Sequence, residues 1–576
     1  MQALIDFTDA SSGRPGALRH AFDTPLETLL ATTAPEVPAL LDAVQRHARA
    51  GRWCVGYVRY EVATAFDAAY TVHTADGPLA WFGVYDHALA WPEVPSLPPA
   101  RVDWTDGPNR ADFDADLARI HAAIAAGELY QVNHTAALHG TLQGQPLALF
   151  QALQRAQPGG YAAFIDSGHE QLLSVSPELF FDWNREHILA RPMKGTAPRG
   201  ADAAEDRARE QALRSSPKER AENVMIVDLL RNDLSRVAEP HSVSVPRLFH
   251  TEALPTVWQM SSDVMARVRP GTTLAQVFGA LFPCGSITGA PKVQAMRLIH
   301  ALEARPRGVY CGAIGVVRPG GHATFNVAIR TVTVRGTELR CGIGSGITSD
   351  ATAEGEWQEW RHKRAFLDRA SQPFELLETL RLQDGQLYEA PRHLARMAGT
   401  ARHFGFAYDA ADLQAALQDE ANRHPAGLRR LRLLLASDGT IRAESFAMEA
   451  TPPRVRVQLA PQPLDAPDDF IRHKTTRRAH YEALAPRDPA VFDTLLCNTR
   501  GELTEGTRCN VAVKLAGRWL TPALACGLLG GVGREIWLEQ GRIAEAVIPI
   551  EALRDAEGLA VFNSLRGWIE AELSEV

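Results

Sequence analysis

The sequence lacks the features of a membrane protein, a disulfide-stabilised scaffold or a nucleic-acid-binding protein. No apolar run approaches the ~20 residues that a bilayer-spanning helix requires. The seven cysteines are an odd, scattered set without a Cys-x-x-Cys pair, which favours reduced thiols over a disulfide framework. The net charge of −8 argues against nucleic acid or an anionic membrane as a partner. We therefore expect neither partner.

Targeting signals, repeats and flexible linkers are also missing. Near Asp6 and Asp9 no basic segment precedes an apolar stretch, so we expect no signal peptide and a cytoplasmic protein. We find no internal repeat, low-complexity tract or Gly/Ser-rich linker. What remains is an ordinary globular composition, 45% hydrophobic and 22% charged. A length of 576 residues predicts roughly three to five domain-sized units.

Helical and strand-like segments alternate through the first 371 residues. The proline-dense stretch from Trp91 to Trp104 can continue neither a helix nor a central strand. Apolar Phe113, Leu117 and Ile120 then recur at helical spacing, and Gly127 is placed to end that helix. Short β-branched and aromatic runs follow between helical stretches. The mixture predicts an α+β class, with an α/β body in this part of the chain.

A domain boundary is expected near residue 372. After Pro373 the sequence predicts a strand, a turn at Asp384 and Gly385, and a returning strand. The rest again mixes strands and helices. We therefore divide the chain into domains 1–371 and 372–576.

Two pairs of glutamates stand out in the first domain. Glu219 and Glu222, and likewise Glu356 and Glu359, are three residues apart and would share one face of a helix. Two such pairs can form an oxygen cage for a hard cation such as Mg²⁺. The alternative is four solvated glutamates paired to neighbouring lysine and arginine side chains.

Three further segments are weak indications when taken singly. Lys194 stands between proline and glycine, where a lysine is usually a solvated surface residue. The segment from Phe282 to Lys292 is rich in Gly, Ser and Thr, whose N–H and O–H groups can hold an anionic oxygen. The glycine-dense run from Cys341 to Asp350 lets backbone approach a ligand closely.

Together these segments resemble one family. From about residue 50 to 368 the chain is similar to the chorismate-utilising enzymes, in segments such as SPELFF, RPMKGTAPRG, KERAENVMIVDLLRNDL, FPCGSITGAPK and EGEWQEWRHK. Within that family, anthranilate synthases carry alanine where this chain has Lys194, whereas the component I aminodeoxychorismate synthases carry lysine. The resemblance therefore implies Mg²⁺-dependent amination of chorismate to 4-amino-4-deoxychorismate.

The resemblance also implies roles for individual residues. Lys194, as a neutral amine, would add at C2 of chorismate and expel the C4 hydroxyl, after which ammonia adds at C4 and releases the lysine. The metal and the ring carboxylate would lie among Glu219, Glu222, Glu356 and Glu359. The positions that it assigns to substrate binding are Thr288, Gly289, Arg330, Lys363 and Gln259.

Two features of the first domain imply that a reacting group, a proton donor and ammonia respectively, comes from elsewhere. Many family members have histidine at the position of Gln259, and glutamine cannot donate a proton near neutral pH. We therefore expect the leaving hydroxyl to be protonated by another residue. The sequence has no Gly-x-Cys-x-Gly nucleophile elbow, so ammonia would come from a separate glutamine amidotransferase subunit or from free ammonium.

The second domain offers an anion site. Gly530, Gly531 and Gly533 precede a helical stretch, as in a phosphate cradle at a helix N-terminus, and Arg396 can add a bidentate charge. Glycines before a helix are more often simple turns. However, the order of several segments in this domain resembles that of the fold-type IV pyridoxal-phosphate enzymes. These segments are APRHLARM, FIRHKTTRRAHYEAL, LTEGTRCNVAV, TPALACGLLGGVGRE and FNSLRG. That group contains branched-chain and D-amino-acid transaminases and aminodeoxychorismate lyase.

By this resemblance Lys474 is the Schiff-base lysine and Glu505 the partner of the pyridine nitrogen. The alternative for Lys474 is a surface lysine in a basic run. The cofactor phosphate would be held by Arg396, Val532 and Gly533. The substrate-side loop would contain Asn563, Ser564 and Arg566. As a lyase, this domain would release pyruvate from aminodeoxychorismate and leave 4-aminobenzoate.

Each domain predicts the substrate or product of the other. The leading hypothesis is therefore a bifunctional enzyme that makes 4-aminobenzoate, a folate precursor. Two alternatives stay open for the second domain: an amino-acid transaminase, or an inactive docking module that holds the amidotransferase or dimerises the synthase. Oligomeric state, including a homodimer through this domain, channelling, and an effector such as tryptophan are also open.

Overall fold

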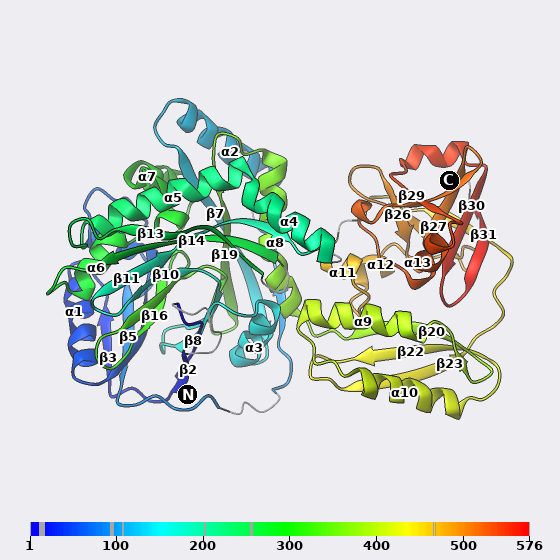
Figure 1. The fold of residues 1–576 in the computed structure, drawn as a ribbon, viewed down its shortest axis with the longest axis horizontal. Helices are drawn as coiled ribbons and strands as arrows, with labels where there is room; N and C mark the ends of the chain where they lie inside the picture. The colour runs from blue at the N-terminus through cyan, green and yellow to red at the C-terminus, as the bar shows by residue number, and fades with distance from the viewer. Residues whose placement is uncertain are drawn as a thin grey trace. The chain divides into compact units, whose positions relative to one another are not determined.

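The computed structural model separates the chain into two compact units, Met1–Pro373 and Phe374–Val576, which are described separately. Figure 1 shows both. The described residues are 2–10, 18–92, 97–105, 107, 109–200, 203–253, 257–464, 466 and 468–574. All seven cysteines are free and buried. Among the described residues, no helix combines the length and the apolar character needed to cross a membrane.

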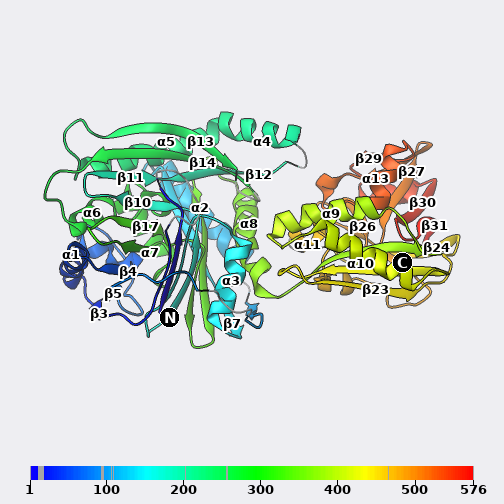
Figure 2. The same cartoon turned by 60° about the horizontal axis from the view of Figure 1, so that its bottom comes forward.

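The first unit contains two large antiparallel sheets, which Figure 2 shows from a second side. The first sheet consists of β1 (Ala3–Phe7), β2 (Leu18–Phe22), β6 (Arg101–Trp104), β7 (Gln131–Gln143), β8 (Tyr161–Asp166), β9 (Gln171–Ser176), β15 (Gly289–Ala290), β18 (Thr331–Arg335) and β19 (Glu338–Ile347). Its strand order in the described part of the chain is β15-β7-β19-β18-β9-β8-β1-β2, with β6 beside β7.

The second sheet consists of β3 (Glu27–Ala31), β4 (Trp53–Val58), β5 (Ala80–Tyr85), β10 (Leu179–Trp183), β11 (His187–Arg191), β12 (Met193–Pro198), β13 (Ser244–Ala253), β14 (Val257–Arg267), β16 (Ala313–Val317) and β17 (Ala323–Val327). Its order among the described residues is β12-β14-β11-β10-β17-β16-β4-β5-β3, and β13 also pairs with β14.

The two sheets pack face to face with helices outside them. The helices of this unit are α1 (Glu36–Arg49), η1 (Tyr60–Ala65), α2 (Arg110–Ala125), α3 (Pro146–Ala156), α4 (Ala203–Ser215), α5 (Pro217–Ser235), α6 (Leu274–Leu281), η2 (Gly285–Ile287), α7 (Lys292–Leu302) and α8 (Ala353–Ser371). One core holds side chains of both sheets, such as Ile5 and Val55. A second core joins α1, α5 and α6 to the second sheet, and a third joins α2, α3 and α8 to the first. The result is an α/β sandwich of four layers.

The local sequence explains helix α2 and the segments on either side of it. The prediction of a helix around Phe113, Leu117 and Ile120 is confirmed by α2, which buries these three side chains. Gly127 follows its end with a φ of +75°, a conformation that glycine adopts without strain. In the proline-dense stretch before it, residues 93–96 lie outside the described part. The stretch also ends in a strand, β6, which pairs with β7 on one side only, and such an edge position is compatible with prolines nearby.

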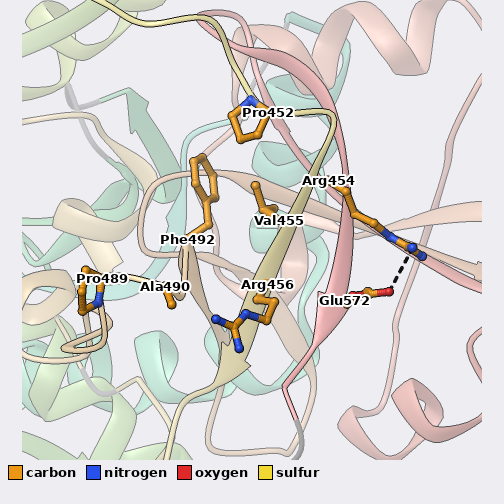
Figure 3. Close-up of a pocket in the computed structure, with 8 residues that line it drawn as sticks. All are labelled: Pro452, Arg454, Val455, Arg456, Pro489, Ala490, Phe492 and Glu572. Carbon is orange, nitrogen blue, oxygen red and sulfur yellow. Dashed lines mark ion pairs between the residues drawn. The ribbon is translucent and has the colours of Figure 1, made fainter.

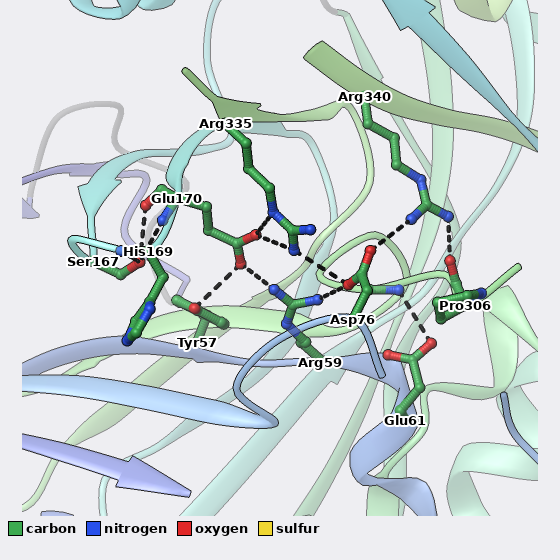
Figure 4. A network of polar contacts seen from close by, with 11 residues as sticks. Tyr57, Arg59, Glu61, Asp76, Ser167, His169, Glu170, Pro306, Arg335 and Arg340 are labelled. Atoms are coloured by element: carbon green, nitrogen blue, oxygen red, sulfur yellow. Dashed lines mark hydrogen bonds and ion pairs between the residues drawn. The ribbon is translucent and has the colours of Figure 1, made fainter. Parts of the chain in front are cut away.

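An ionic network around the buried side chains of Arg59 and Glu170 joins both sheets at one end of the first unit (Figure 4). Arg59, directly after β4, is 1% exposed, and its Nη2 donates to Glu170 Oε1 at 2.5 Å. Its other terminal nitrogen binds Asp76. Arg335 on β18 donates to the second oxygen of Glu170 at 2.9 Å, and Arg340 on β19 lies 3.5 Å from Asp76. The carboxylates therefore tie the end of β4 to strands of the opposite sheet.

The second unit contains a smaller and a larger sheet. The smaller comprises β20 (Leu376–Gln383), β21 (Gln386–Leu387), β22 (Leu428–Leu435) and β23 (Ile441–Ala447), in the described order β21-β20-β22-β23, with α9 (Ala390–Phe404) and α10 (Ala410–Arg423) packed on it. The predicted turn between β20 and β21 is confirmed: φ is +50° at Asp384 and +76° at Gly385, as a tight hairpin requires.

The larger sheet of the second unit consists of β24 (Arg454–Leu459), β25 (Asp493–Cys497), β26 (Leu503–Gly506), β27 (Asn510–Leu515), β28 (Arg518–Pro522), β29 (Ala544–Ala546), β30 (Gly558–Asn563) and β31 (Gly567–Leu573). Its order in the described residues is β26-β25-β24-β31-β30-β27-β28-β29, with both parallel and antiparallel pairs. Its helices are α11 (Asp468–Arg472), α12 (Ala479–Glu482), η3 (Leu524–Cys526), α13 (Val532–Glu539) and η4 (Ile550–Asp555).

Candidate functional site

The four glutamates singled out in the first unit lie on two helices, and charged side chains near both helices affect the pKa of these glutamates. Glu219 and Glu222 lie on α5, and Glu356 and Glu359 lie on α8. Burial raises the pKa of Glu219, and the charges of Glu359 and Glu356 raise it further, whereas nearby Lys194 lowers it. Burial also raises the pKa of Glu222 and of Glu356. Because the α8 carboxylates raise the pKa of Glu219 and Glu222 on α5, the two predicted pairs lie within electrostatic range of each other.

The donor set consists of carboxylate oxygens, which is the chemistry that Mg²⁺ prefers. Three of the four side chains already have protein partners: Ser345 Oγ donates to Glu356 Oε2 at 2.5 Å, Lys363 Nζ lies 2.6 Å from Glu359 Oε1, and Lys218 Nζ lies 3.9 Å from Glu222 Oε1. Within the described ranges, no three carboxylate, histidine or cysteine side chains converge closely enough to hold a metal ion. The residues fit Mg²⁺ in kind, and the ion would compete with Ser345 and Lys363 for these oxygens.

Lys194 lies on β12 and faces the carboxylates rather than open solvent. Its side chain is half-buried, and its charge lowers the pKa of Glu219 and Glu222. A Cβ atom added to Gly346 would lie 3.1 Å from Lys194 Nζ and 2.2 Å from Gln131 Nε2. The glycine-dense run before α8 therefore leaves room for these two polar side chains. The predicted close approach of its backbone to a ligand stays a prediction.

The structure adds two polar residues that the sequence analysis missed. Glu178, between β9 and β10, is 4% exposed, and Ser286 Oγ donates to its Oε1 at 2.7 Å. Burial raises the pKa of Glu178 to about 7, against the opposing effects of Ser286 and Lys194. Gln131 on β7 is 1% exposed, and its Oε1 has no hydrogen-bond partner in the described part of the chain. Glu178 lies in the quoted segment SPELFF, but only tertiary burial distinguishes it from other glutamates.

The predicted substrate loop packs against the start of β7. Thr288 is fully buried, and its Oγ1 donates to the carbonyl oxygen of Cys284 at 3.0 Å, so this hydroxyl is used inside the loop. Gly289 has a φ of +140°, and a Cβ atom there would lie 2.2 Å from the carbonyl oxygen of Gln131. Only glycine allows this approach.

The other predicted substrate contacts have protein partners. Lys363 donates to the carbonyl oxygen of Gly344 at 2.9 Å in addition to its ion pair. Arg330 donates to Gln157 Oε1, and burial together with the charge of Arg369 lowers its pKa to about 10. Among the described contacts of Arg330, none is with the four glutamates. Gln259 Nε2 donates to the carbonyl oxygen of Gly195 on β12 at 2.8 Å.

In the second unit, a buried carboxylate orients Arg396. Glu378 on β20 is 1% exposed and accepts hydrogen bonds from Arg396 Nε at 2.8 Å and Nη2 at 2.6 Å. Its Oε2 also lies 2.6 Å from His393 Nδ1. Burial opposes ionisation of Glu378, but the charge of Arg396 and these bonds hold its pKa at about 2. The remaining nitrogen, Arg396 Nη1, donates to the carbonyl oxygen of Gly530 at 3.0 Å, so the arginine lies at the glycine turn. Its predicted bidentate contact with a phosphate stays a prediction.

The glycine turn leads directly into α13. Gly531 is the residue before the helix, and a Cβ atom there would lie 2.0 Å from Asn510 Oδ1. A Cβ atom on Gly533 would lie 2.8 Å from the backbone nitrogen of Ser564. The first backbone N–H groups of the helix, beginning at Val532, suit an anion. This cradle fits the phosphate of the implied cofactor.

Lys474 and Glu505 have the properties that the implied cofactor needs. Lys474 is half-buried; burial, with the charges of Arg478 and Arg396, lowers its pKa to about 8. Glu505 is 5% exposed, and Tyr481 Oη donates to its Oε1 at 2.7 Å. Burial raises the pKa of Glu505 to about 7. The two groups influence each other's ionisation, so the structure brings these predicted residues into one site.

The predicted substrate-side loop is held by its own hydrogen bonds. Asn563 Oδ1 accepts from the backbone nitrogen of Arg566 at 2.8 Å, and Arg566 Nη1 donates to Thr451 Oγ1 at 3.3 Å. Ser564 Oγ lies 3.0 Å from His393 Nε2, which links the loop to the Glu378 network.

A separate open pocket of the second unit contains none of the predicted residues (Figure 3). Its charged wall includes Arg454 and Glu572, which form an ion pair at 3.1 Å. The full lining is Pro452, Arg454, Val455, Arg456, Pro489, Ala490, Phe492 and Glu572. The candidate sites are therefore defined by their polar residues rather than by this pocket.

Comparison with known families gives two matches. The chorismate binding enzyme family matches residues 11–369, and amino-transferase class IV matches residues 375–572. Both parts of the expected fold, an α+β chorismate-enzyme sandwich followed by a class IV aminotransferase domain, are thereby confirmed.

Curated relatives match the first part of the chain. Aminodeoxychorismate synthase component 1 of Klebsiella aerogenes is 41% identical over 276 residues, which is 47% of this chain and 61% of that protein. Its counterpart in Salmonella typhimurium is 38% identical over 289 residues, 50% of this chain and 62% of that protein. The matches thus span about three fifths of these relatives. Anthranilate synthase component I of Streptococcus pneumoniae has a similar fold, with a TM-score of 0.51 and 23% identity, covering 64% of this chain and 90% of that one.

Proposed function

This chain belongs to the chorismate binding enzyme family, and from that membership we propose its function. In our proposal the first unit aminates chorismate to 4-amino-4-deoxychorismate, and the second eliminates pyruvate from that product to give 4-aminobenzoate, a folate precursor. The observation that carries the proposal is the position of Lys194, a half-buried amine beside the buried acid Glu178 and the carboxylates of α5.

The first reaction begins with Lys194. Its neutral amine bonds to C2 of chorismate as the bond between C4 and its hydroxyl breaks, and Glu178 gives the hydroxyl a proton so that it leaves as water. Ammonia then bonds to C4, the bond between C2 and the lysine nitrogen breaks, and the surplus proton on the new amine returns to Glu178. Chorismate and ammonia thus become aminodeoxychorismate and water.

The remaining residues of this site bind and orient. Glu219, Glu222, Glu356 and Glu359 would hold Mg²⁺, which when bound polarises the ring carboxylate and diene. Gln131, with an unpaired and buried Oε1 near Lys194, would accept a hydrogen bond from a substrate hydroxyl.

Ammonia would be supplied by a glutamine amidotransferase partner. The sequence has no nucleophile elbow of its own for glutamine hydrolysis, and the similar proteins are named as component 1.

We place the reaction in the cytoplasm, because free buried thiols are typical of a reducing compartment.

In the second reaction Lys474 moves a proton. Pyridoxal phosphate, when bound, supplies an electron sink for the substrate carbon that carries the amine. A pKa of about 8 lets Lys474 be neutral in part near neutral pH, so it can take the C4 proton as the bond between C3 and the enolpyruvyl oxygen breaks. The lysine then gives that proton to the leaving group, which becomes pyruvate. Glu505 would hold a proton at the pyridine nitrogen. Arg396 and the N-terminus of α13 would hold the phosphate.

Product analysis tests the proposal. We expect aminodeoxychorismate from chorismate, Mg²⁺ and ammonium without pyridoxal phosphate, and 4-aminobenzoate with pyruvate when pyridoxal phosphate is added. Formation of anthranilate alone, or no product, would contradict the synthase assignment.

The match to amino-transferase class IV favours one second candidate, an amino-acid transaminase in the second unit. Amino transfer to 2-oxoglutarate without pyruvate release from aminodeoxychorismate would support it over the lyase.

A further inference from the structure

The strand that carries Lys194 is irregular at that residue. Between Met193 and Thr196 the pairing of β12 with β14 shifts register, because three steps along β12 match two steps along β14. One residue is therefore inserted, and Lys194 and Gly195 form the bulge. Gly195 has a φ of +87°, which side-chain-bearing residues rarely adopt. A bulge of this kind turns a side chain out of the regular alternation of a strand.

Gln259 on β14 fills the hydrogen-bonding gap that the bulge leaves. Its side chain is 8% exposed, and its Nε2 donates to the carbonyl oxygen of Gly195 at 2.8 Å. Its Oε1 accepts from Thr196 Oγ1 at 3.0 Å. Nε2 also lies 3.2 Å from the carbonyl oxygen of Met260. Both ends of the amide are therefore hydrogen-bonded to protein groups.

Gly195 adds a second constraint at the same place. A Cβ atom on it would lie 2.9 Å from Glu219 Oε2. The bulge therefore brings the backbone of β12 against a carboxylate of the site, with the Lys194 side chain next to it.

We propose that Gln259 is a positioning residue that holds the Lys194 bulge, in place of the substrate-binding role predicted from the sequence. The amide takes over the contacts that a regular strand pair would supply, and so it fixes the direction of the lysine. This inference rests on the proposed amination, in which Lys194 must reach the reacting carbon.

Steady-state kinetics of Gln259→Met test the inference, because methionine keeps the length of the side chain and removes all three hydrogen bonds of the amide. We expect kcat for chorismate amination to fall roughly 10- to 100-fold, as for a misplaced reacting group, while KM for chorismate stays unchanged. Glu252→Ala is the matched control: Glu252 pairs with Gln259 from β13, is exposed, and should leave kcat unchanged.

A double-mutant cycle separates positioning from substrate binding. In a Lys194→Ala background, Gln259→Met should cause no further loss, because no lysine is left to position. A rise in KM with unchanged kcat, or an equal loss in both backgrounds, would overturn the inference.

Chemical labelling keeps the inference testable if the wild type does not aminate chorismate, an outcome that would refute the proposed function alone. The rate at which an amine-selective reagent modifies Lys194, followed by mass spectrometry, should change several-fold in Gln259→Met and not in Glu252→Ala. The rate at other lysines should stay constant in both, which shows that the fold is intact. An unchanged rate at Lys194 would refute the positioning role.

Discussion

Among single side chains, Glu178 is the proton donor of the proposed amination, a role that glutamine at position 259 cannot fill. Its segment was part of the resemblance, yet nothing in SPELFF separates this glutamate from a solvated one. Its burial, the hydroxyl of Ser286 and the charge of Lys194 arise from segments far apart in the sequence. Spacing along a helix was enough for the four metal-site candidates, whereas Glu178 and Gln131 required the folded chain.

Replacing Glu178 by Gln removes the proposed acid without changing its size. We expect kcat for amination to fall about 10²- to 10⁴-fold, the usual contribution of a general acid. The acid form of a group with a pKa of about 7 is lost as pH rises through 7, so wild-type kcat should decline there. Because Ser286 lowers this pKa, Ser286→Ala should move the decline to higher pH. A wild-type rate independent of pH between 6 and 8 would contradict the role.

Lys474 gives the corresponding prediction in the second unit. Lys474→Ala should abolish pyruvate release and the visible absorbance of the lysine-bound cofactor, while aminodeoxychorismate accumulates. Wild-type elimination should increase as pH rises through about 8, because the neutral amine is the active form. Lys514→Ala, on β27, is a control that should retain both signals. Retained pyruvate release in Lys474→Ala would contradict the lyase assignment.

Among helices and strands, the start of α13 depends on a close approach between backbone segments. Gly533 lies against the backbone of Asn563 and Ser564, so a methyl group must displace that loop or the helix. We expect Gly533→Ala to weaken pyridoxal phosphate binding roughly tenfold or more, from an overpacking cost of about 1–3 kcal/mol. Gly399→Ala is the control, because Gly399 lies in α9 with open space around it. Fluorescence titration with the cofactor would measure both; equal affinities would rule out the cradle.

Across the first unit as a whole, the ionic network ties the two sheets together. Glu170→Gln would leave the buried Arg59 without its buried counter-charge, and we expect a loss of roughly 3–5 kcal/mol in the free energy of unfolding. The exposed pair of Arg110 and Asp114 is the matched control, since Asp114→Asn should cost no more than about 1 kcal/mol. Urea denaturation followed by tryptophan fluorescence would compare the free energies of unfolding of the two variants. Equal losses would show that the network adds no more stability than an exposed ion pair.

Local order in this chain follows from local chemistry. The apolar spacing of Phe113, Leu117 and Ile120, the turn at Asp384 and Gly385, and the sequence of motifs in each half act over a few residues, so the helices, the hairpin and the family could be predicted from them. The bulge at Lys194, the partners of Gln259 and the pKa of Glu178 belong to the tertiary structure. Each depends on which distant segments pack together in one poorly solvated interior. Burial and the neighbouring charges there set the ionisation of Glu178, and the packed strands set the orientation of the Lys194 and Gln259 side chains.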